Sequence, residues 1–251
     1  MYHPPDFGTN APDMEEFIEL LNLTDTHVPL FDPAYPTNVW RLANAVSFQF
    51  PLNTVIPPHG TLIVVPFNPA TDAAALTAFQ SRHGASGSLV GPFSGKLDNA
   101  GETLELWRPD TPQSPARPDA GFVPQLLVES ISYDDDPPWP VAADGGGASL
   151  QRIVAAHYGN DPVNWRAGAP TAGAPNLIPP TGTASLPGNG KVQLSFAVQP
   201  GFTYQLECRD DLGDAGWLPL GLPVMAETDS LVIEDEISGQ PQRFYRLAVM
   251  P

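Results

Sequence analysis

The sequence predicts an all-β protein built of two β-sandwiches, with one short helix in the first. Hydrophobic and polar residues alternate in several short runs, such as residues 46–50 and 192–198, which is the pattern of a strand with one face on a core. Turn-forming sequences, such as residues 57–60 and 98–101, separate these runs. The 31 prolines and 22 glycines among the 251 residues then punctuate β-structure.

The first part of the chain contains most of the expected elements. Residues 61–65 form a continuous hydrophobic run, which predicts a strand buried on both faces. A helix is expected over residues 73–82, because Thr71 and Asp72 can cap it and Gly84 can end it. A weaker helical turn is expected over residues 150–158. Further strands are expected at residues 16–22, 102–108 and 126–133.

A boundary between two domains is expected where proline and glycine are most frequent. We place one domain at residues 1–175, a linker at 176–190 and a smaller domain at 191–251. In the smaller domain, strands are expected over residues 192–198, 204–209, 231–234 and 243–250, by the same alternation.

Charge and composition exclude several functions. The formal net charge of −17 leaves no basic patch for nucleic acid and disfavours an anionic membrane surface. No apolar run reaches the roughly 20 residues of a membrane span. The single Cys208 cannot form an intrachain disulfide or a cysteine-based zinc site, and its place in an alternating strand predicts a buried, unreactive thiol.

Eight short segments resemble, in order, the motifs of bacterial lamin-tail domains. They are residues 16–22, 39–42, 48–51, 55–64, 95–102, 138–140, 144–150 and 164–165. The resemblance covers about residues 1–176 and implies an immunoglobulin-like β-sandwich. In similar domains a strand runs into the Met-Tyr-His-Pro segment from upstream, so the first strand is expected to be truncated here.

The end of the chain has a separate likeness. Residues 204–209, Trp217 and residues 242–247 resemble a small β-sandwich module found at the ends of large secreted proteins of planctomycetes and verrucomicrobia. Both resemblances imply an extracellular or cell-surface location and other domains of a longer parent chain as partners. The start of the sequence lacks the basic and apolar regions of a signal peptide, so such a peptide is expected outside this chain.

One acidic loop is a candidate metal site. Asp134, Asp135 and Asp136 concentrate carboxylates between Tyr133 and a proline-rich stretch, and Ca²⁺ prefers such oxygen ligands on a stiff loop. The spacing is not that of a known calcium loop, and consecutive side chains on an extended chain diverge. The alternative is a solvated acidic turn, with Trp139 packed over the end of the sandwich. No cofactor other than Ca²⁺ is expected.

Aromatic side chains give the second candidate site. Alternation places Trp107 on the strand face opposite Leu104 and Leu106, so its ring is expected to face solvent, where it could stack on a sugar. Tyr133 and Trp139, beside the acidic loop, complete the candidate ligand contacts.

Catalytic patterns are weak. The five histidines are scattered without metal-ligand spacing, and no nucleophile motif is present. We therefore expect a non-catalytic binding, adhesion or spacer module of a larger secreted or cell-surface bacterial protein. One alternative is a carbohydrate-binding module attached to a polysaccharide-degrading enzyme. Another is a hydrolase whose active site the sequence does not reveal. The expected ligand is a polysaccharide or another cell-surface molecule.

Overall fold

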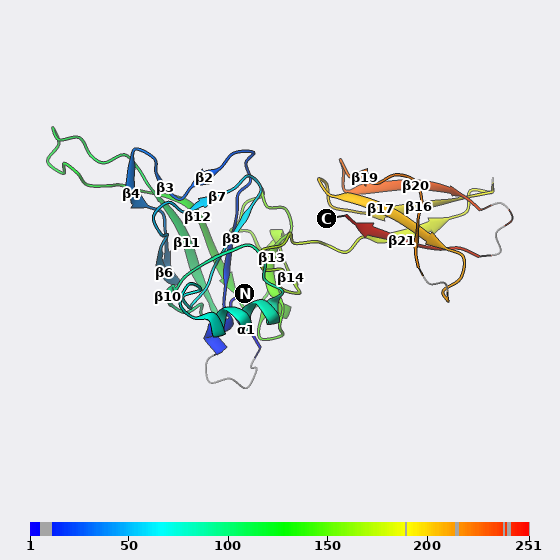
Figure 1. Cartoon of the computed structure of the whole chain (residues 1–251), viewed down its shortest axis with the longest axis horizontal. Coiled ribbons are helices and arrows are strands. Elements are labelled where there is room, and N and C mark those ends of the chain that lie inside the picture. The colour runs from blue at the N-terminus through cyan, green and yellow to red at the C-terminus, as the bar shows by residue number, and fades with distance from the viewer. Residues whose placement is uncertain (6–11, 189, 214–215, 238, 240–241, 251) are drawn as a thin grey trace. The chain divides into compact units, whose positions relative to one another are not determined.

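The structure is a computed structural model, and the all-β prediction is confirmed. It describes every residue except 6–11, 189, 214–215, 238, 240–241 and 251. The chain divides into two compact units, Met1–Asn176 and Leu177–Pro251. Strands dominate both units, and one α-helix lies among the described residues (Figure 1).

The first unit contains fourteen strands among its described residues, with helix α1 (Ala73–His83) and three 3-10 turns at Pro12–Glu15, Val141–Ala143 and Pro162–Asn164. The strands are β1 (Ile18–Leu21), β2 (Val28–Pro29), β3 (Phe31–Asp32), β4 (Tyr35–Val39), β5 (Arg41–Asn44), β6 (Val46–Gln49), β7 (Val55–Ile56), β8 (Thr61–Val64), β9 (Ser88–Val90), β10 (Ser94–Gly95), β11 (Gly101–Pro109), β12 (Gln125–Asp134), β13 (Ser149–Arg152) and β14 (Trp165–Gly168).

Two sheets of the first unit enclose its main core. One has the strand order β1-β8-β9, and the other has the order β10-β6-β5-β11-β12. Ile18 and Leu62 from the first sheet pack in one hydrophobic cluster with Leu42, Phe48 and Tyr133 from the second. Alternation in β6 places Val46 and Phe48 in this core and leaves Ser47 and Gln49 exposed, as the sequence predicts.

Strand β8 is buried on both faces, which confirms the expectation for its continuous hydrophobic run. Leu62 and Val64 face the main core, whereas Ile63 joins a second cluster with Phe79 of α1. Helix α1 begins after Asp72, whose side chain accepts a hydrogen bond from the Ala75 amide, and ends at Gly84, a left-handed residue with φ of 61°. The predicted helix over residues 73–82 is therefore confirmed.

Three short pairs of strands and one bridge complete the first unit. Strands β2 and β7 pair, as do β3 and β4. The expected helical turn over 150–158 is wrong at its start: Ser149–Arg152 is strand β13, which pairs with β14 and buries Ser149 and Gln151. Near the N-terminus, His3 forms an isolated parallel β-bridge with Asp144.

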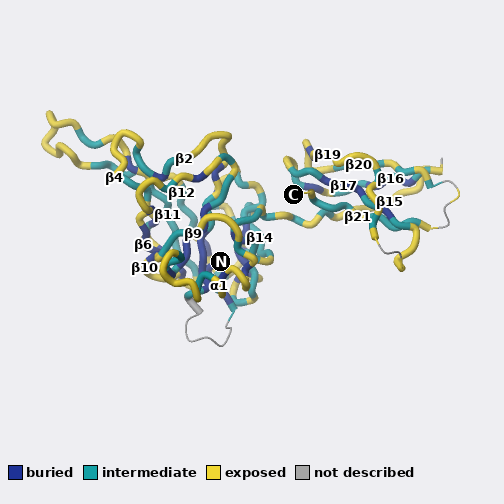
Figure 2. The backbone as a smooth tube through the Cα atoms, viewed as in Figure 1, coloured by how far each residue is buried: buried dark blue, intermediate teal, exposed yellow. Residues whose placement is uncertain are grey.

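The second unit has seven strands among its described residues: β15 (Thr181–Ser185), β16 (Lys191–Ala197), β17 (Thr203–Arg209), β18 (Leu218–Pro219), β19 (Val224–Met225), β20 (Ser230–Glu236) and β21 (Phe244–Val249). They form a three-stranded sheet of order β15-β16-β20 and a four-stranded sheet in which β17 pairs with β18, β19 and β21. Leu194 from one sheet and Leu206 from the other share a core cluster. Figure 2 shows buried segments inside each unit and exposed loops around them.

The segment predicted as a linker contains a strand. Residues 181–185 form β15, which pairs antiparallel with β16 from Thr181↔Ala197 to Ser185↔Gln193. The prediction of a linker over 176–190 is corrected at this point. All five residues of β15 are exposed, so this edge strand lacks the hydrophobic alternation by which sequence reasoning finds strands.

Candidate functional site: the outer face of the five-stranded sheet

Trp107 lies on the outer face of the five-stranded sheet, as its alternation with Leu104 and Leu106 predicts. Leu104 and Leu106 pack against the main core, while Trp107 is half-buried on the other side of β11. The ladder register places Trp107 opposite Arg41 of β5 and opposite Leu127 of β12, and it places Arg41 opposite Gln49 of β6. These four side chains, Gln49, Arg41, Trp107 and Leu127, form a line across four strands that we call the Trp107 row.

The indole of Trp107 is held in place by its own strand. Its Nε1 donates a hydrogen bond of 2.8 Å to the Glu105 carboxylate. Glu105 lies two residues earlier on the same face of β11, so the ring extends along the strand and lies over the sheet surface. The charge-assisted bond fixes the orientation of the ring, which is partly exposed.

Arg41 is the cationic member of the row. Its guanidinium carbon lies 6.0 Å from the centre of the Trp107 ring, at the outer limit of a cation–π contact. Among the described residues, Arg41 forms no ion pair and no hydrogen bond through its side chain, and it is exposed. Its donors are therefore available to an external acceptor.

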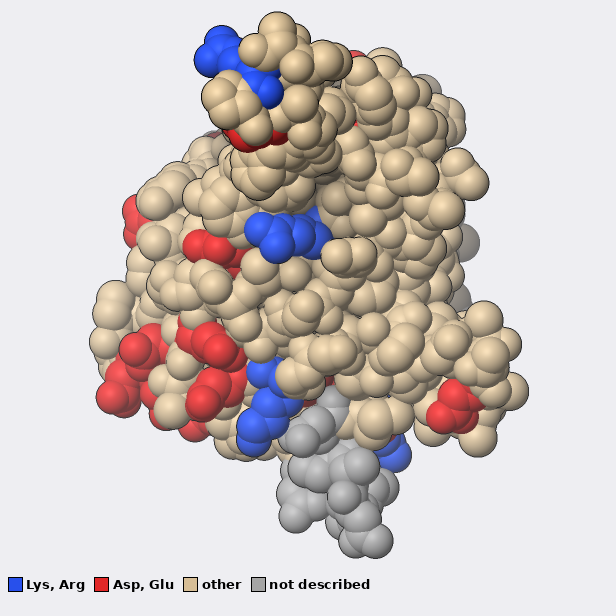
Figure 3. Space-filling model, turned by 90° about the vertical axis from the view of Figure 1, so that its left-hand side faces the viewer, with Lys and Arg blue, Asp and Glu red and all other residues tan. Residues whose placement is uncertain are grey.

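Short hydroxyl side chains lie on the same outer face, to one side of the row. On the outer face, Ser47 of β6 pairs with Ser94 of β10, and the Thr103 and Ser132 hydroxyls of β11 and β12 lie 2.8 Å apart. Seen from the side of β6 and β10, most of the surface is neither acidic nor basic, and acidic side chains gather toward one lower edge (Figure 3). The face thus combines one oriented indole with neutral polar groups.

Two other predicted ligand contacts are not available to a ligand. Tyr133 and Trp139 are each 7% exposed and belong to the main core. Tyr133 donates a 2.9 Å hydrogen bond to the Asp98 carbonyl, and Trp139 packs against Trp165 with ring centres 6.0 Å apart. The expectation that they contact a ligand is corrected, because both rings are enclosed. Trp139 instead has the packing role that was the alternative.

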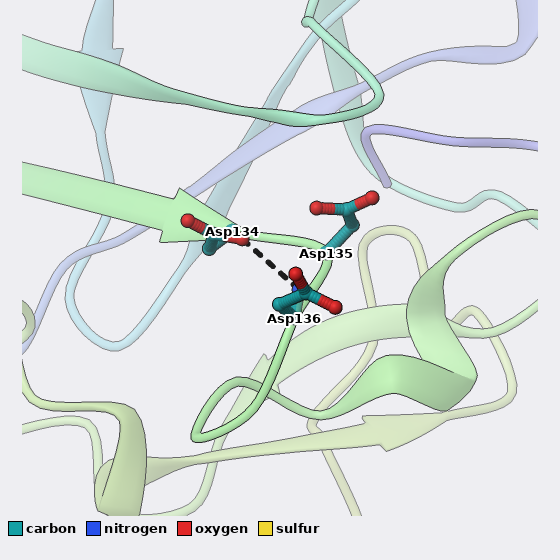
Figure 4. A group of neighbouring side chains, drawn as sticks. All are labelled: Asp134, Asp135 and Asp136. Carbon is teal, nitrogen blue, oxygen red and sulfur yellow. Dashed lines mark hydrogen bonds between the residues drawn. The ribbon is translucent and has the colours of Figure 1, made fainter.

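Asp134 is the last residue of β12, and Asp135 and Asp136 follow it in the loop (Figure 4). Asp134, Asp135 and Asp136 each offer a carboxylate oxygen within 4.8 Å of the others. The Asp136 amide donates a 3.0 Å hydrogen bond to Asp134 Oδ1, so the chain turns and the side chains converge, where an extended chain would separate them. Partial desolvation, a hydrogen bond with Asp134 and the neighbouring charges raise the pKa of Asp135.

A buried tyrosine lies near this loop. The Tyr2 hydroxyl is buried and has no hydrogen-bond partner among the described residues. Its ring packs on Tyr133, the residue before the aspartates, with ring centres 4.7 Å apart. Burial first, and then the charges of Asp144, Asp135 and Asp134, raise the pKa of Tyr2 to about 12. The phenol therefore stays protonated, as a donor beside several carboxylates.

The histidine–carboxylate pair of the first unit lies inside the fold. His83 Nε2 lies 2.8 Å from Glu15 Oε2, and both side chains are almost fully buried. The Glu15 carboxylate also contacts the Arg82 guanidinium. The pair thus joins α1 to the segment before β1 and is closed to a substrate. In the second unit, a shallow trough of about 440 Å³ is lined by residues of β15 and β16 and by Asp229 and Ser230.

Sequence reasoning missed Arg41 and Glu105 as parts of the Trp107 site. Alternation shows which face of a strand a residue takes, but the register that sets Arg41 against Trp107 is a long-range property. It also missed the two arginines that flank Trp217 in the second unit, whose ring lies 4.4 Å from the Arg209 guanidinium carbon and 4.7 Å from that of Arg246. Only the nearby Trp and Arg residues in the sequence could have hinted at this cluster.

Comparison with known proteins gives no further constraint, since no family model, curated protein or solved structure matches the chain. Within the described part of the chain, no helix has the length and apolar character needed to cross a membrane.

Proposed function

We propose that the chain is a non-catalytic binding or adhesion module of a larger secreted or cell-surface bacterial protein, and that the Trp107 row is its binding surface. In this proposal the first unit is an immunoglobulin-like, lamin-tail-like sandwich, and the second is a small module of the kind found at the ends of secreted proteins. The remaining domains of the parent chain are its covalent partners.

The observation that carries the proposal is the fixed indole of Trp107 on an open sheet face. A half-buried tryptophan whose N–H is already bonded to Glu105 loses little conformational freedom when a ligand stacks on it. Arg41 beside it offers free donors. Aromatic and arginine side chains with these properties are the residues that most often dominate binding energy.

A ligand array tests this proposal. The labelled full chain is applied to immobilised neutral polysaccharides, acidic polysaccharides and extracellular proteins, in parallel with Trp107→Ala and with Phe122→Ala. Phe122 is an exposed aromatic residue outside the row and serves as the matched control. We expect at least one immobilised ligand to retain the original chain and Phe122→Ala but not Trp107→Ala. That ligand should keep its full length after incubation with the protein. The proposal would be contradicted if every ligand retained all three proteins equally, or if the protein shortened the polymer.

We also propose that Ca²⁺ binds at Asp134, Asp135 and Asp136. Two observations support this: the three carboxylates offer oxygens within 4.8 Å of one another, and the buried Tyr2 hydroxyl, whose pKa is raised by burial and by charges that include those of Asp135 and Asp134, has no hydrogen-bond partner among the described residues. Carboxylates this close repel one another, and a cation would relieve that repulsion. After treatment with a chelator, addition of Ca²⁺ should raise the melting temperature, and an unchanged melting temperature would end this proposal.

A further inference from the structure

The Trp107 row has a direction and a length. It crosses β6, β5, β11 and β12 at right angles to the strands. Because neighbouring strands lie about 4.8 Å apart, its four side chains span about 14 Å. A ligand that contacts all of them is elongated and lies across the strands.

The two halves of the row have different chemistry. Trp107 and Leu127, which is half exposed, offer apolar surface. Arg41 and Gln49 offer hydrogen-bond donors and, in Gln49, an acceptor. A chain of sugar rings matches this division, because each ring has an apolar C–H face for an aromatic ring and hydroxyl groups at its edge. The serine and threonine hydroxyls on one side of the row suit the same hydroxyl-rich ligand.

The net charge of the chain favours a neutral polymer over an acidic one. The chain carries a formal net charge of −17, so its field repels acidic polysaccharides and nucleic acids. One exposed guanidinium, with the Glu105 carboxylate beside the same ring, does not reverse that field. A protein partner fits the row less well, because its indole and its leucine lie beside Arg41, Gln49 and Glu105, whereas the centre of a protein interface is apolar and depleted of charge.

We propose that the Trp107 row binds a neutral polysaccharide chain that runs across the strands, with one sugar ring stacked on Trp107 and the neighbouring rings hydrogen-bonded to Arg41 and Gln49. This inference rests on the proposed binding function and specifies its ligand.

Affinity electrophoresis of the full chain tests the inference. Gels contain a neutral polymer (mixed-linkage β-glucan, xylan or galactomannan) or an acidic one (polygalacturonate or alginate). We expect at least one neutral polymer to retard the chain and the acidic polymers not to. Trp107→Ala should weaken binding at least tenfold, and Arg41→Met and Gln49→Ala about threefold each, while Phe122→Ala has no effect. Thermal melts of each variant separate lost binding from lost folding.

Oligosaccharides of the retarding polymer test the length of the binding surface. Affinity should rise with oligosaccharide length until the ligand spans about 14 Å and then stay constant. Retardation by acidic polymers only, or an equal effect of Phe122→Ala and Trp107→Ala, would overturn the inference. If the array finds a protein ligand that depends on Trp107 while no neutral polymer retards the chain, the binding function stands and this inference fails. If no ligand depends on Trp107, both fail.

Discussion

Arg243 joins the two sheets of the second unit, and its removal is predicted to destabilise that unit selectively. Its Nη1 lies 3.0 Å from Asp235 of β20, and its Nε lies 2.7 Å from Asp210, just after β17. Asp235 also accepts a 2.7 Å hydrogen bond from Tyr245 of β21. Hydrogen bonds to the two carboxylates raise the pKa of Arg243, and the bond from Arg243 lowers the pKa of Asp210.

The size of the stability loss expected in Arg243→Ala follows from how far the paired side chains are buried. The Asp235 side chain is 10% exposed and that of Arg243 16%, whereas Asp210 is half exposed. In Arg243→Ala, Asp235 becomes a buried carboxylate with Tyr245 as its remaining described partner. Removal of one partner of a buried pair costs roughly 3–5 kcal/mol. We take the lower end, about 3 kcal/mol, because Tyr245 still donates and because the exposed contact with Asp210 contributes little.

Hydrogen exchange on the full chain measures this prediction. Peptides that cover β17 and β21 should lose about two orders of magnitude in protection in Arg243→Ala, since 1.36 kcal/mol corresponds to a factor of ten. Peptides from β8 in the first unit should be unchanged. Asp210→Asn is the matched control and should change protection less than fivefold. A similar loss in both variants, or a loss of less than fivefold in Arg243→Ala, would refute the role of the buried pair.

Three further predictions concern the first unit. Phe79 is 1% exposed beneath α1, so Phe79→Ala should lower the unfolding free energy in urea by about 4 kcal/mol, and a loss below about 1 kcal/mol would contradict its core position. Burial, followed by the charges of the Met1 amino group and Arg82, lowers the pKa of His83 to about 4, against about 6.5 when unfolded. The unfolded state then binds more protons between these values, so stability should fall as the pH drops from about 6.5 to about 4, and His83→Gln should show a flatter profile. Any stabilisation by Ca²⁺ should be reduced in Asp135→Asn, and equal stabilisation of both proteins would place the ion elsewhere.

The strands that face a core on one side could be predicted from the sequence. Val46 and Phe48 alternate with Ser47 and Gln49, and each took its expected face. The buried run at β8 and the helix between Asp72 and Gly84 were equally local features. These elements were predictable because hydrophobic periodicity and capping residues act within a few positions of the chain.

The features that were missed depend on long-range pairing or on local turns. Strand β15 is an exposed edge strand whose Thr-Gly-Thr-Ala-Ser sequence carries no hydrophobic signal. The face taken by Tyr133 could not be read from β12, where Leu126, Leu127 and Val128 are consecutive and a register shift occurs opposite Leu106 and Trp107. In the same way, the aspartates converge because of a turn at Asp134 that residue spacing does not reveal.

The most direct test of the central claim is an NMR titration of the full chain with an oligosaccharide of the neutral polymer that it binds. The chain contains five tryptophans, and their indole N–H signals can be assigned by single substitutions. The Trp107 row predicts that the Trp107 signal shifts progressively with ligand, while the signals of the buried Trp139 and of Trp217 in the second unit stay in place. An unmoved Trp107 signal at saturating ligand would contradict the claim that this face binds the ligand.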